Sequence, residues 1–140
     1  MPKVFTSTKQ KIGKLGEELA KRFLMKHGYT ILEENYTKKY GEMDLIAQKN
    51  DKIHFVEVKS IISYNPSVSH ETKEDVSCET YDPLQNMNCM KLRRLSRVIQ
   101  VYLLSKSVTR VTDWQFDVIT VKIKEKERIG TVKHLKNIII

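Results

Sequence analysis

The chain has 140 residues, a length that suits one domain built around a single hydrophobic core. A formal charge of +8 favours a polyanionic partner, most commonly nucleic acid and less often an anionic membrane surface, with an ordinary basic soluble protein as the alternative. No apolar run approaches the roughly 18 residues that span a bilayer, and the N-terminus lacks a secretory apolar stretch, so we expect a cytoplasmic protein with no membrane partner.

The first part of the chain predicts a helix followed by three strands. Apolar residues recur at helical spacing over residues 8–27, and Gly28 follows them as a C-terminal stop. Strand-like runs come next, at residues 29–32, 41–48 and 53–61. The four polar residues 49–52 between the last two runs predict a tight hairpin turn.

The second part begins with residues 62–86, which are rich in Ser, Thr, Asn and Asp and carry five acidic residues against one lysine. They predict a long acidic loop or mobile arm. A helix over residues 87–105, a strand over 114–123 and a last strand within 129–140 are expected to follow. The whole order predicts a single α/β domain over residues 1–140, with a mixed central β-sheet flanked by helices.

Two cysteines and several acidic residues bear on chemistry. Cys78 and Cys89 have no metal-type spacing and are expected to be free thiols in a reducing compartment.

Asp44 and Glu57 interrupt two apolar strand-like runs, and a desolvated carboxylate costs several kcal/mol unless it is paired or binds a metal. The two strands therefore carry either an ion-pair cluster or a metal-dependent catalytic site.

Hairpin register predicts which charged residues meet. With a two-residue turn at Asn50-Asp51, Asp44 lies opposite Glu57. Glu42 then lies opposite Lys59. Because directly opposed Cβ atoms are about 4.5–5.5 Å apart, a proton, a cation or a hard metal ion must offset the repulsion between the carboxylates of Asp44 and Glu57. Mg²⁺ binds through one or two carboxylates and keeps several waters, which suits Asp44 and Glu57.

Four further residues have two interpretations each. Glu42 and Lys59 form a cross-strand ion pair, or Lys59 leans toward a metal-bound water. Glu17 lies between Gly13 and Ala20 at the margin of the first helix's apolar face, so it is an inward-pointing third acid or a solvated helix charge. Lys91 falls inside the apolar stripe of the second helix, where it snorkels to solvent or contacts a phosphate.

Several motifs between residues 11 and 121 belong together: Gly13-x-x-Gly16-Glu17, Gly28-Tyr29, Asn35, Gly41-Glu42-Met43-Asp44-Leu45-Ile46-Ala47, Phe55-Val56-Glu57-Val58-Lys59, Lys91 and Phe116-Asp117-Val118. Together they resemble the YraN-like family of small bacterial proteins, within the PD-(D/E)XK nuclease superfamily. The chain departs from the family pattern at Ile61 and Gln115, where the family usually has basic residues.

The resemblance implies a restriction-endonuclease-like core in the order α-β-β-β-α-β. Asp44 and Glu57 would ligate Mg²⁺ or Mn²⁺, with the backbone carbonyl of Val58 as a further ligand. Glu17 would complete the acidic shell directly or through water, and Lys59 would orient or deprotonate the attacking water. The residues expected to contact nucleic acid are Lys91, Arg93 and Arg94, and Glu42 would support the site.

Three hypotheses for the function follow. The first is a metal-dependent endonuclease acting on DNA, including branched or structured DNA. The second is a nucleic-acid-binding module of the same fold with weak or no catalysis, which the missing basic residues favour. The third is an interaction or scaffold protein whose acidic residues 62–86 dock a basic partner or a second copy of the chain in a homodimer.

Overall fold

The computed structural model describes residues 8–63, 89–106, 113–124 and 129–138. These residues form, in chain order, α1 (Thr8–Lys26), β1 (Thr30–Lys38), β2 (Gly41–Lys49), β3 (Lys52–Ser63), α3 (Cys89–Ser105), β4 (Asp113–Lys124) and β5 (Ile129–Leu135). The order of helices and strands predicted from the sequence is confirmed, and so is the α/β fold class.

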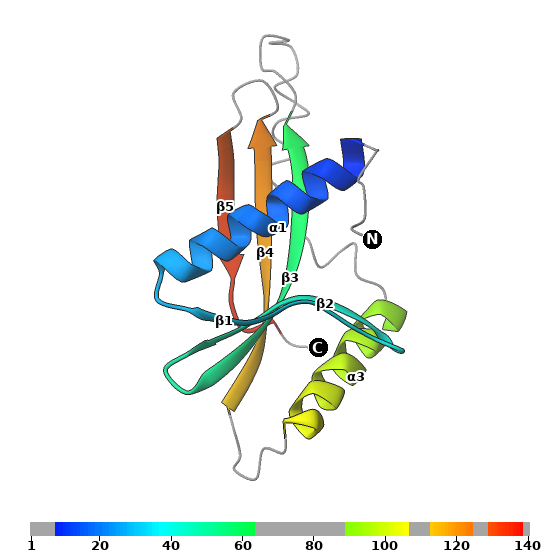
Figure 1. Ribbon diagram of the computed structural model, residues 1–140. Coiled ribbons are helices and arrows are strands. Elements are labelled where there is room, and N and C mark those ends of the chain that lie inside the picture. The colour runs from blue at the N-terminus through cyan, green and yellow to red at the C-terminus, as the bar shows by residue number, and fades with distance from the viewer. Residues whose placement is uncertain (1–7, 64–88, 107–112, 125–128, 139–140) are drawn as a thin grey trace, which may run out of the picture.

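The strands form one mixed sheet in the order β1-β2-β3-β4-β5. β3 and β4 are parallel, whereas the other neighbouring pairs are antiparallel. A parallel pair needs a crossover connection, and α3 lies within the one between β3 and β4. In Figure 1, α1 crosses the sheet over β3, β4 and β5, while α3 lies beside the far end of the β1–β2 hairpin. The sheet therefore packs between two helices.

Alternating side chains of the strands divide between two cores. Leu45 and Val56 pack with Leu24 of α1 in one core. Ile46 and Phe55 belong to the other core, to which α3 contributes its buried residues Leu95, Val98, Ile99 and Tyr102. This division follows from the two-residue period of a strand, which sends neighbouring side chains to opposite faces.

The β2–β3 hairpin has the turn expected from the sequence. Asn50 and Asp51 have φ values of 51° and 63°, as both central residues of a type I′ turn require. The printed register runs from Lys49 opposite Lys52 to residues 45 and 56, which confirms the predicted alignment over that stretch. Asp44 and the residues before it lie beyond the last recorded β2–β3 pair, so they are not ladder partners of β3.

β2 changes orientation near Asp44. Met43 and Ile46 lie three positions apart and would face opposite sides of a regular strand, yet both pack into the α3-side core. In the same stretch β2 still pairs with β1 through Met43 and Tyr36. The strand therefore stays paired on one side while it leaves β3 on the other, which opens the sheet beside the Asp44 carboxylate.

Two strands extend beyond their predicted ends. β3 continues through Ile62 and Ser63, which pair with Ile123 and Lys124 of β4, although the sequence placed residue 62 in the acidic loop. Parallel pairing with β4 supplies the backbone partners that the polar composition did not suggest. β1 continues from the predicted end at Leu32 to Lys38 by pairing with β2, and the sequence missed this part because most of its residues are exposed and show no apolar alternation. The predicted acidic loop otherwise lies outside the described residues.

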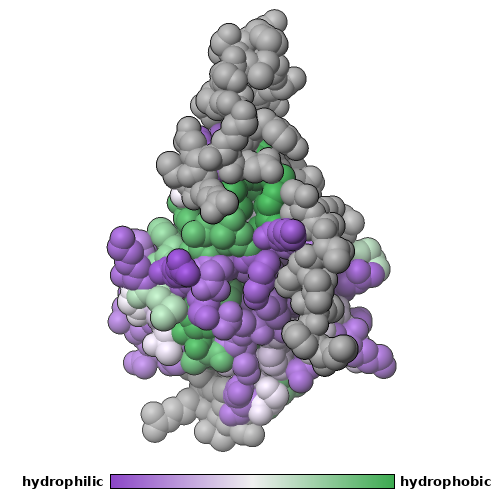
Figure 2. Space-filling view, turned by 45° about the horizontal axis from the view of Figure 1, so that its top comes forward, coloured by the Kyte–Doolittle hydropathy of each residue, from purple (hydrophilic) through white to green (hydrophobic). Residues whose placement is uncertain are grey.

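The described surface is largely polar. The face shown in Figure 2 is hydrophilic across its middle, and hydrophobic residues gather above this band. Cys89 is an exposed free thiol, as expected, and Cys78 lies outside the described residues. Among the helices that the structure describes, none has the length and apolar character needed to cross a bilayer.

Candidate active site

α1 packs closely against the sheet at Gly16. A Cβ atom at this position would collide with Ser60 Oγ and lie 3.0 Å from Ser60 Cβ, so glycine permits this close contact. The approach carries the next residue, Glu17, toward the sheet, where it is half-buried. The sequence pattern predicted this role for Gly13 and Ala20. Ala20 is indeed fully buried, but a Cβ at Gly13 would meet nothing within 4 Å, so Gly16 takes its place.

Asp44 is held at the point where β2 leaves β3. Its Oδ2 accepts a hydrogen bond from the backbone N–H of Val58, with 2.8 Å between the two heavy atoms. Burial raises the pKa of Asp44 to about 8, and the nearby charge of Glu57 adds to this rise, followed by those of Glu17 and Glu42. The structure therefore brings the four predicted acidic residues into one cluster.

Asn35 joins two of these acids. With its amide nitrogen facing them, it donates hydrogen bonds to Glu17 Oε1 at 2.9 Å and to Glu42 Oε1 at 3.1 Å. Its φ of 50° lies in the left-handed region, which Asn tolerates better than most residues. Burial raises the pKa of Glu17; Lys14 opposes this shift, and Glu42 and Glu57 add to it.

The partner of Glu42 differs from the one expected. Register predicted Lys59 opposite this residue, but the ladder between β2 and β3 ends before Glu42 and its carboxylate instead meets Asn35. On its other side, Glu42 pairs with Thr37 of β1. The register predicted from the two-residue period of a strand could not reveal this change of partner, because such a prediction assumes that both strands stay paired over their full length.

Two lysines share the remaining acid. Glu57 Oε1 lies 3.5 Å from Lys91 Nζ and 3.8 Å from Lys59 Nζ. Burial lowers the pKa of Lys59, and the proximity of Lys91 adds to this effect. Burial also acts to lower the pKa of Lys91, but its contacts with Lys59 and Glu57 outweigh burial and raise it. A lysine with a lowered pKa is more often in the neutral form, which is the form that can accept a proton.

The donor set of the cluster fits a hard divalent cation. Asp44 and Glu57 offer carboxylate oxygens, and the raised pKa of Asp44 shows that this pair favours a bound positive charge. In the part of the chain that the structure describes, no three His, Cys, Asp or Glu side chains are grouped as ligands of one ion. The protein would thus supply two carboxylates and leave several positions to water, as Mg²⁺ usually prefers.

The predicted nucleic-acid contacts lie at different distances from this cluster. Lys91 reaches Glu57 and lines a cavity of about 570 Å³ together with Arg94 and Glu42. Arg93 does not line that cavity but the neighbouring groove beside the β1–β2 turn. A further cavity of about 530 Å³, lined by Glu17 and Asn35 among others, also reaches Glu42. Glu42 therefore lies where the cavities around the cluster meet.

A second polar cluster surrounds Asp117, whose side chain is fully buried. Its Oδ2 accepts hydrogen bonds from His54 Nδ1 and His134 Nε2, both at 2.8 Å. Its Oδ1 accepts from Gln115 Nε2 at 2.7 Å and from the backbone N–H of Asn137 at 2.9 Å. Burial acts to raise the pKa of Asp117, but these four hydrogen bonds lower it to about 2.

This cluster was not predicted from the sequence, and it changes the interpretation of one departure from the family pattern. Gln115 donates to Asp117, so it belongs to this network and does not lie beside the Asp44–Glu57 pair. Two signals were present: Asp117 interrupts an apolar strand, and Gln115, two residues earlier, shares its face. The two histidines come from β3 and β5, which only the folded sheet brings together.

The motifs of the site agree with a comparison with known families. A model of the uncharacterised protein family UPF0102 matches residues 16–121, which include every residue of the acidic cluster. The chain belongs to the UPF0102 family. UPF0102 is the YraN-like family that the sequence motifs indicated, so that prediction is confirmed, and the family belongs to the PD-(D/E)XK-like nuclease superfamily.

Other UPF0102 proteins are similar over nearly the whole chain. The relative from Alkaliphilus oremlandii is 38% identical over 130 residues, covering 91% of this chain and 97% of its own length. A relative from Caldanaerobacter subterraneus is 33% identical over 130 residues, covering 92% and 94%. A solved structure of Pyrococcus furiosus SfsA in complex with Ca²⁺ is weakly similar, with a TM-score of 0.39 and 11% identity, covering all of this chain and 76% of that one.

Proposed function

We propose that this UPF0102 protein is a metal-dependent nuclease that hydrolyses phosphodiester bonds in DNA, including branched or structured DNA. The observation that carries the proposal is the pair of half-buried Asp44 and buried Glu57, in which burial and the neighbouring charge raise the pKa of Asp44 to about 8. Such a pair needs a proton or a cation. Lys91, whose Nζ lies 3.5 Å from Glu57 Oε1, supplies positive charge where a phosphate would bind, and Lys59 Nζ lies 3.8 Å from the same oxygen.

The residues of the cluster would divide the reaction between them. Asp44 and Glu57, with the Val58 carbonyl, would hold Mg²⁺ or Mn²⁺, and Glu17 would complete the acidic shell directly or through water. The bound ion would lower the pKa of a water and stabilise charge on the phosphate. Lys59, with its lowered pKa, would orient that water and accept its proton as the water oxygen attacks phosphorus and the P–O bond to the leaving oxygen breaks.

The second lysine would act on the phosphate. Lys91 keeps a raised pKa and stays charged, so it suits a contact with a phosphate oxygen whose negative charge grows in the transition state. Asn35 would act as a positioning residue, because it fixes Glu17 and Glu42 on the far side of the cluster.

A second candidate is a nucleic-acid-binding module of the same fold with weak or no catalysis. It is favoured by Ile61, which stands where the family usually has arginine, two residues after Lys59. It is also favoured by the two lysines on Glu57, which already neutralise one of the two metal-binding carboxylates. This candidate predicts salt-sensitive DNA binding that a chelator leaves unchanged.

The test is cleavage of single-stranded, duplex and branched DNA by the purified protein with Mg²⁺, Mn²⁺ or a chelator. We expect metal-dependent cleavage that Asp44→Asn and Glu57→Gln reduce by at least about a hundredfold. Glu34→Gln is the matched control, because Glu34 is an exposed carboxylate that pairs with Lys21 outside the cluster. Calorimetric titration with Mn²⁺ supplies a readout that is independent of turnover.

The outcomes separate the two candidates. Mn²⁺ binding that is lost in Asp44→Asn, together with cleavage, supports the nuclease. Salt-sensitive DNA binding with no Mn²⁺ binding and no cleavage of any of the substrates rejects the nuclease and supports the binding module. Cleavage that persists in both Asp44→Asn and Glu57→Gln would show that the chemistry occurs elsewhere.

A further inference from the structure

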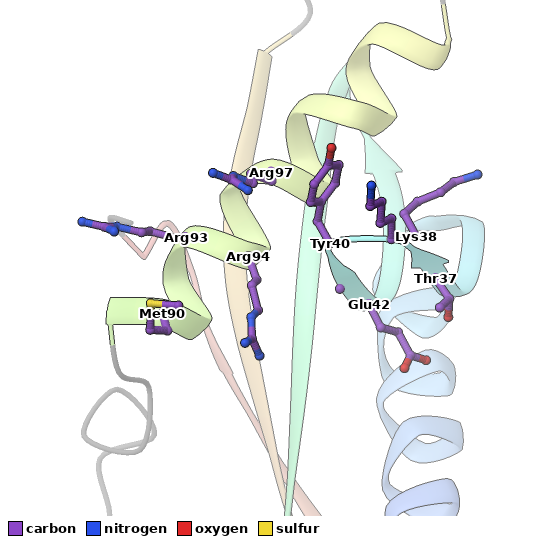
Figure 3. Close-up of a pocket in the computed structure, with 10 residues that line it drawn as sticks. Thr37, Lys38, Tyr40, Glu42, Met90, Arg93, Arg94 and Arg97 are labelled. Carbon is purple, nitrogen blue, oxygen red and sulfur yellow. The ribbon is translucent and has the colours of Figure 1, made fainter.

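A basic groove lies between the β1–β2 turn and α3, next to the candidate site. Its volume is about 620 Å³, and Figure 3 shows side chains from both elements around it. The hairpin contributes Lys38, Lys39 and Tyr40, and the helix contributes arginines at successive turns. The proposed nuclease chemistry uses none of these hairpin residues.

The helix side of the groove carries free positive charge. Arg93, Arg94 and Arg97 are all exposed, and none of them forms an ion pair with another described residue. Arg94 and Arg97 line the groove on one wall and Lys38 lines the other (Figure 3). Guanidinium donors on one wall and an ammonium group on the other match the oxygens of a phosphate backbone.

The hairpin side offers an aromatic surface. Tyr40 lies in the two-residue β1–β2 turn and is 41% exposed, although a large aromatic side chain usually gains by burial. Its ring lies 5.4 Å from Arg97 Cζ and 6.0 Å from Lys39 Nζ. An exposed ring with cations on its flanks provides a stacking surface for one base and binding for the adjacent phosphates.

The groove is continuous with the acidic cluster. It shares Gly41, Glu42, Met90 and Arg94 with the cavity that Lys91 also lines. Lys91 Nζ in turn lies 3.5 Å from Glu57 Oε1. A strand bound in the groove would therefore reach the candidate site past Arg94 and Lys91 without crossing another part of the described surface.

We propose that this groove binds an unpaired nucleic-acid strand beside the candidate site, with a base stacked on Tyr40 and phosphates held by Arg94, Arg97 and Lys38. The strand is unpaired because bases inside a duplex are stacked on one another and do not offer a face to Tyr40. The inference rests on the proposed nuclease function and adds to it the kind of substrate segment that the protein holds.

The test measures binding by fluorescence anisotropy in the Asp44→Asn background, in chelator, so that cleavage does not interfere. The probes are a short oligothymidylate, a fully abasic strand of the same length and a duplex of that length. We expect Tyr40→Ala to weaken oligothymidylate binding by about tenfold, to leave the abasic strand unchanged, and Tyr40→Phe to retain affinity. The duplex should bind more weakly than the oligothymidylate.

The arginines have a different signature. The double variant Arg94→Ala/Arg97→Ala should weaken binding of both single strands and reduce the slope of log affinity against log salt by about 1.4, because each lost phosphate contact on a single strand contributes about 0.7. Arg22→Ala is the matched control, since Arg22 is an exposed arginine of α1 that pairs with Glu18 and does not line the groove. Circular dichroism confirms that each variant is folded.

Three results would overturn the inference. These are a Tyr40→Ala loss that is equal on the base-bearing and abasic strands, no loss at all, or a loss from Arg22→Ala as large as that from the arginine pair. Cleavage is scored separately with the wild-type protein and Mn²⁺. If the protein cleaves DNA but the binding tests fail, only the inference about the groove is rejected. If the binding tests succeed but the protein does not cleave DNA, only the nuclease proposal is rejected.

Discussion

The backbone N–H of Val58 donates a hydrogen bond to Asp44, with 2.8 Å between N and Oδ2. The bond forms just past the last recorded β2–β3 pair, Leu45 with Val56, so a carboxylate takes the place of a backbone partner. This exchange anchors the departing strand and fixes a charged oxygen beside Glu57. The same contact thus ends the hairpin ladder and builds the acidic cluster.

Asp44 makes the stability of the protein depend on pH. Because folding raises the pKa of Asp44 from 3.8 to about 8, the folded state binds a proton that the unfolded state releases between these values. Its contribution to the free energy of unfolding is therefore greatest below about pH 4 and decreases as pH rises toward 8. Asp44→Asn should match the wild type near pH 4 and melt at a higher temperature at pH 8 in chelator.

Melting temperatures measured by circular dichroism across this pH range check the expectation. Asn at this position keeps an oxygen that can accept from Val58, so the variant tests charge and not the loss of the hydrogen bond. Saturating Mg²⁺ should raise the melting temperature of the wild type at pH 8 and leave Asp44→Asn unchanged. Parallel pH profiles for the two proteins would contradict the role assigned to this carboxylate.

Asn35→Gly should weaken the proposed metal site without disturbing the backbone. Glycine accepts the φ of 50° at this position but removes the amide that links Glu17 and Glu42. We expect Mn²⁺ affinity and cleavage to fall about ten- to a hundredfold, as when a ligand loses its supporting hydrogen bond. Asn50→Gly is the matched control, because Asn50 has a φ of 51° in an exposed turn away from the cluster. Equal effects of both variants would indicate a backbone origin.

Gly16→Ala should strain the contact between α1 and β3. The added Cβ would collide with Ser60 Oγ and lie 3.0 Å from Ser60 Cβ, so the serine side chain must rotate or the backbone must shift, at a cost of about 1–3 kcal/mol in the free energy of unfolding. Ser60→Ala in the same chain removes the nearest atom and should restore part of that loss. Urea unfolding of the two single variants and the double variant measures the coupling. Gly13→Ala, where a Cβ meets nothing within 4 Å, should have little effect.

Asp117 stabilises the fold at neutral pH and loses that effect in acid. Its pKa falls from 3.8 in the unfolded chain to about 2 in the folded protein, so the contribution is full above about pH 4 and is lost as pH falls through 2. The difference corresponds to about 2 kcal/mol. Urea unfolding between pH 2 and 5 should show this loss in the wild type.

Asp117→Asn should remove this part of the acid dependence and lower the free energy of unfolding at pH 7 by about 3 kcal/mol. The reason is that an NH₂ group replaces one buried carboxylate oxygen and then faces the N–H groups that donated to that oxygen. Asp51→Asn is the control, since Asp51 is exposed in the β2–β3 turn and Asn tolerates its φ of 63°. If Asp117→Asn loses as much stability between pH 5 and pH 2 as the wild type does, other carboxylates cause the loss.

Local patterns in the sequence were sufficient for most of the fold. The helical repeat before Gly28, the alternating runs and the turn at Asn50 and Asp51 all depend on interactions between near neighbours in the chain. They predicted both helices, the sheet class and the hairpin register from Leu45 to Val56, which the structure confirms. The motifs around Glu57 also identified the family correctly.

The arrangement of the site depended on contacts between residues far apart in the sequence. Asn35 between Glu17 and Glu42, Lys91 on Glu57 and two histidines on Asp117 each join separate elements. The period of a strand predicts which face a side chain occupies, but not where two strands part or how closely a helix approaches them. The sequence by itself determined that Asp44 and Glu57 interrupt two apolar strands, and tertiary packing alone decided which charges meet, because the energy of a charge pair depends on distance and burial.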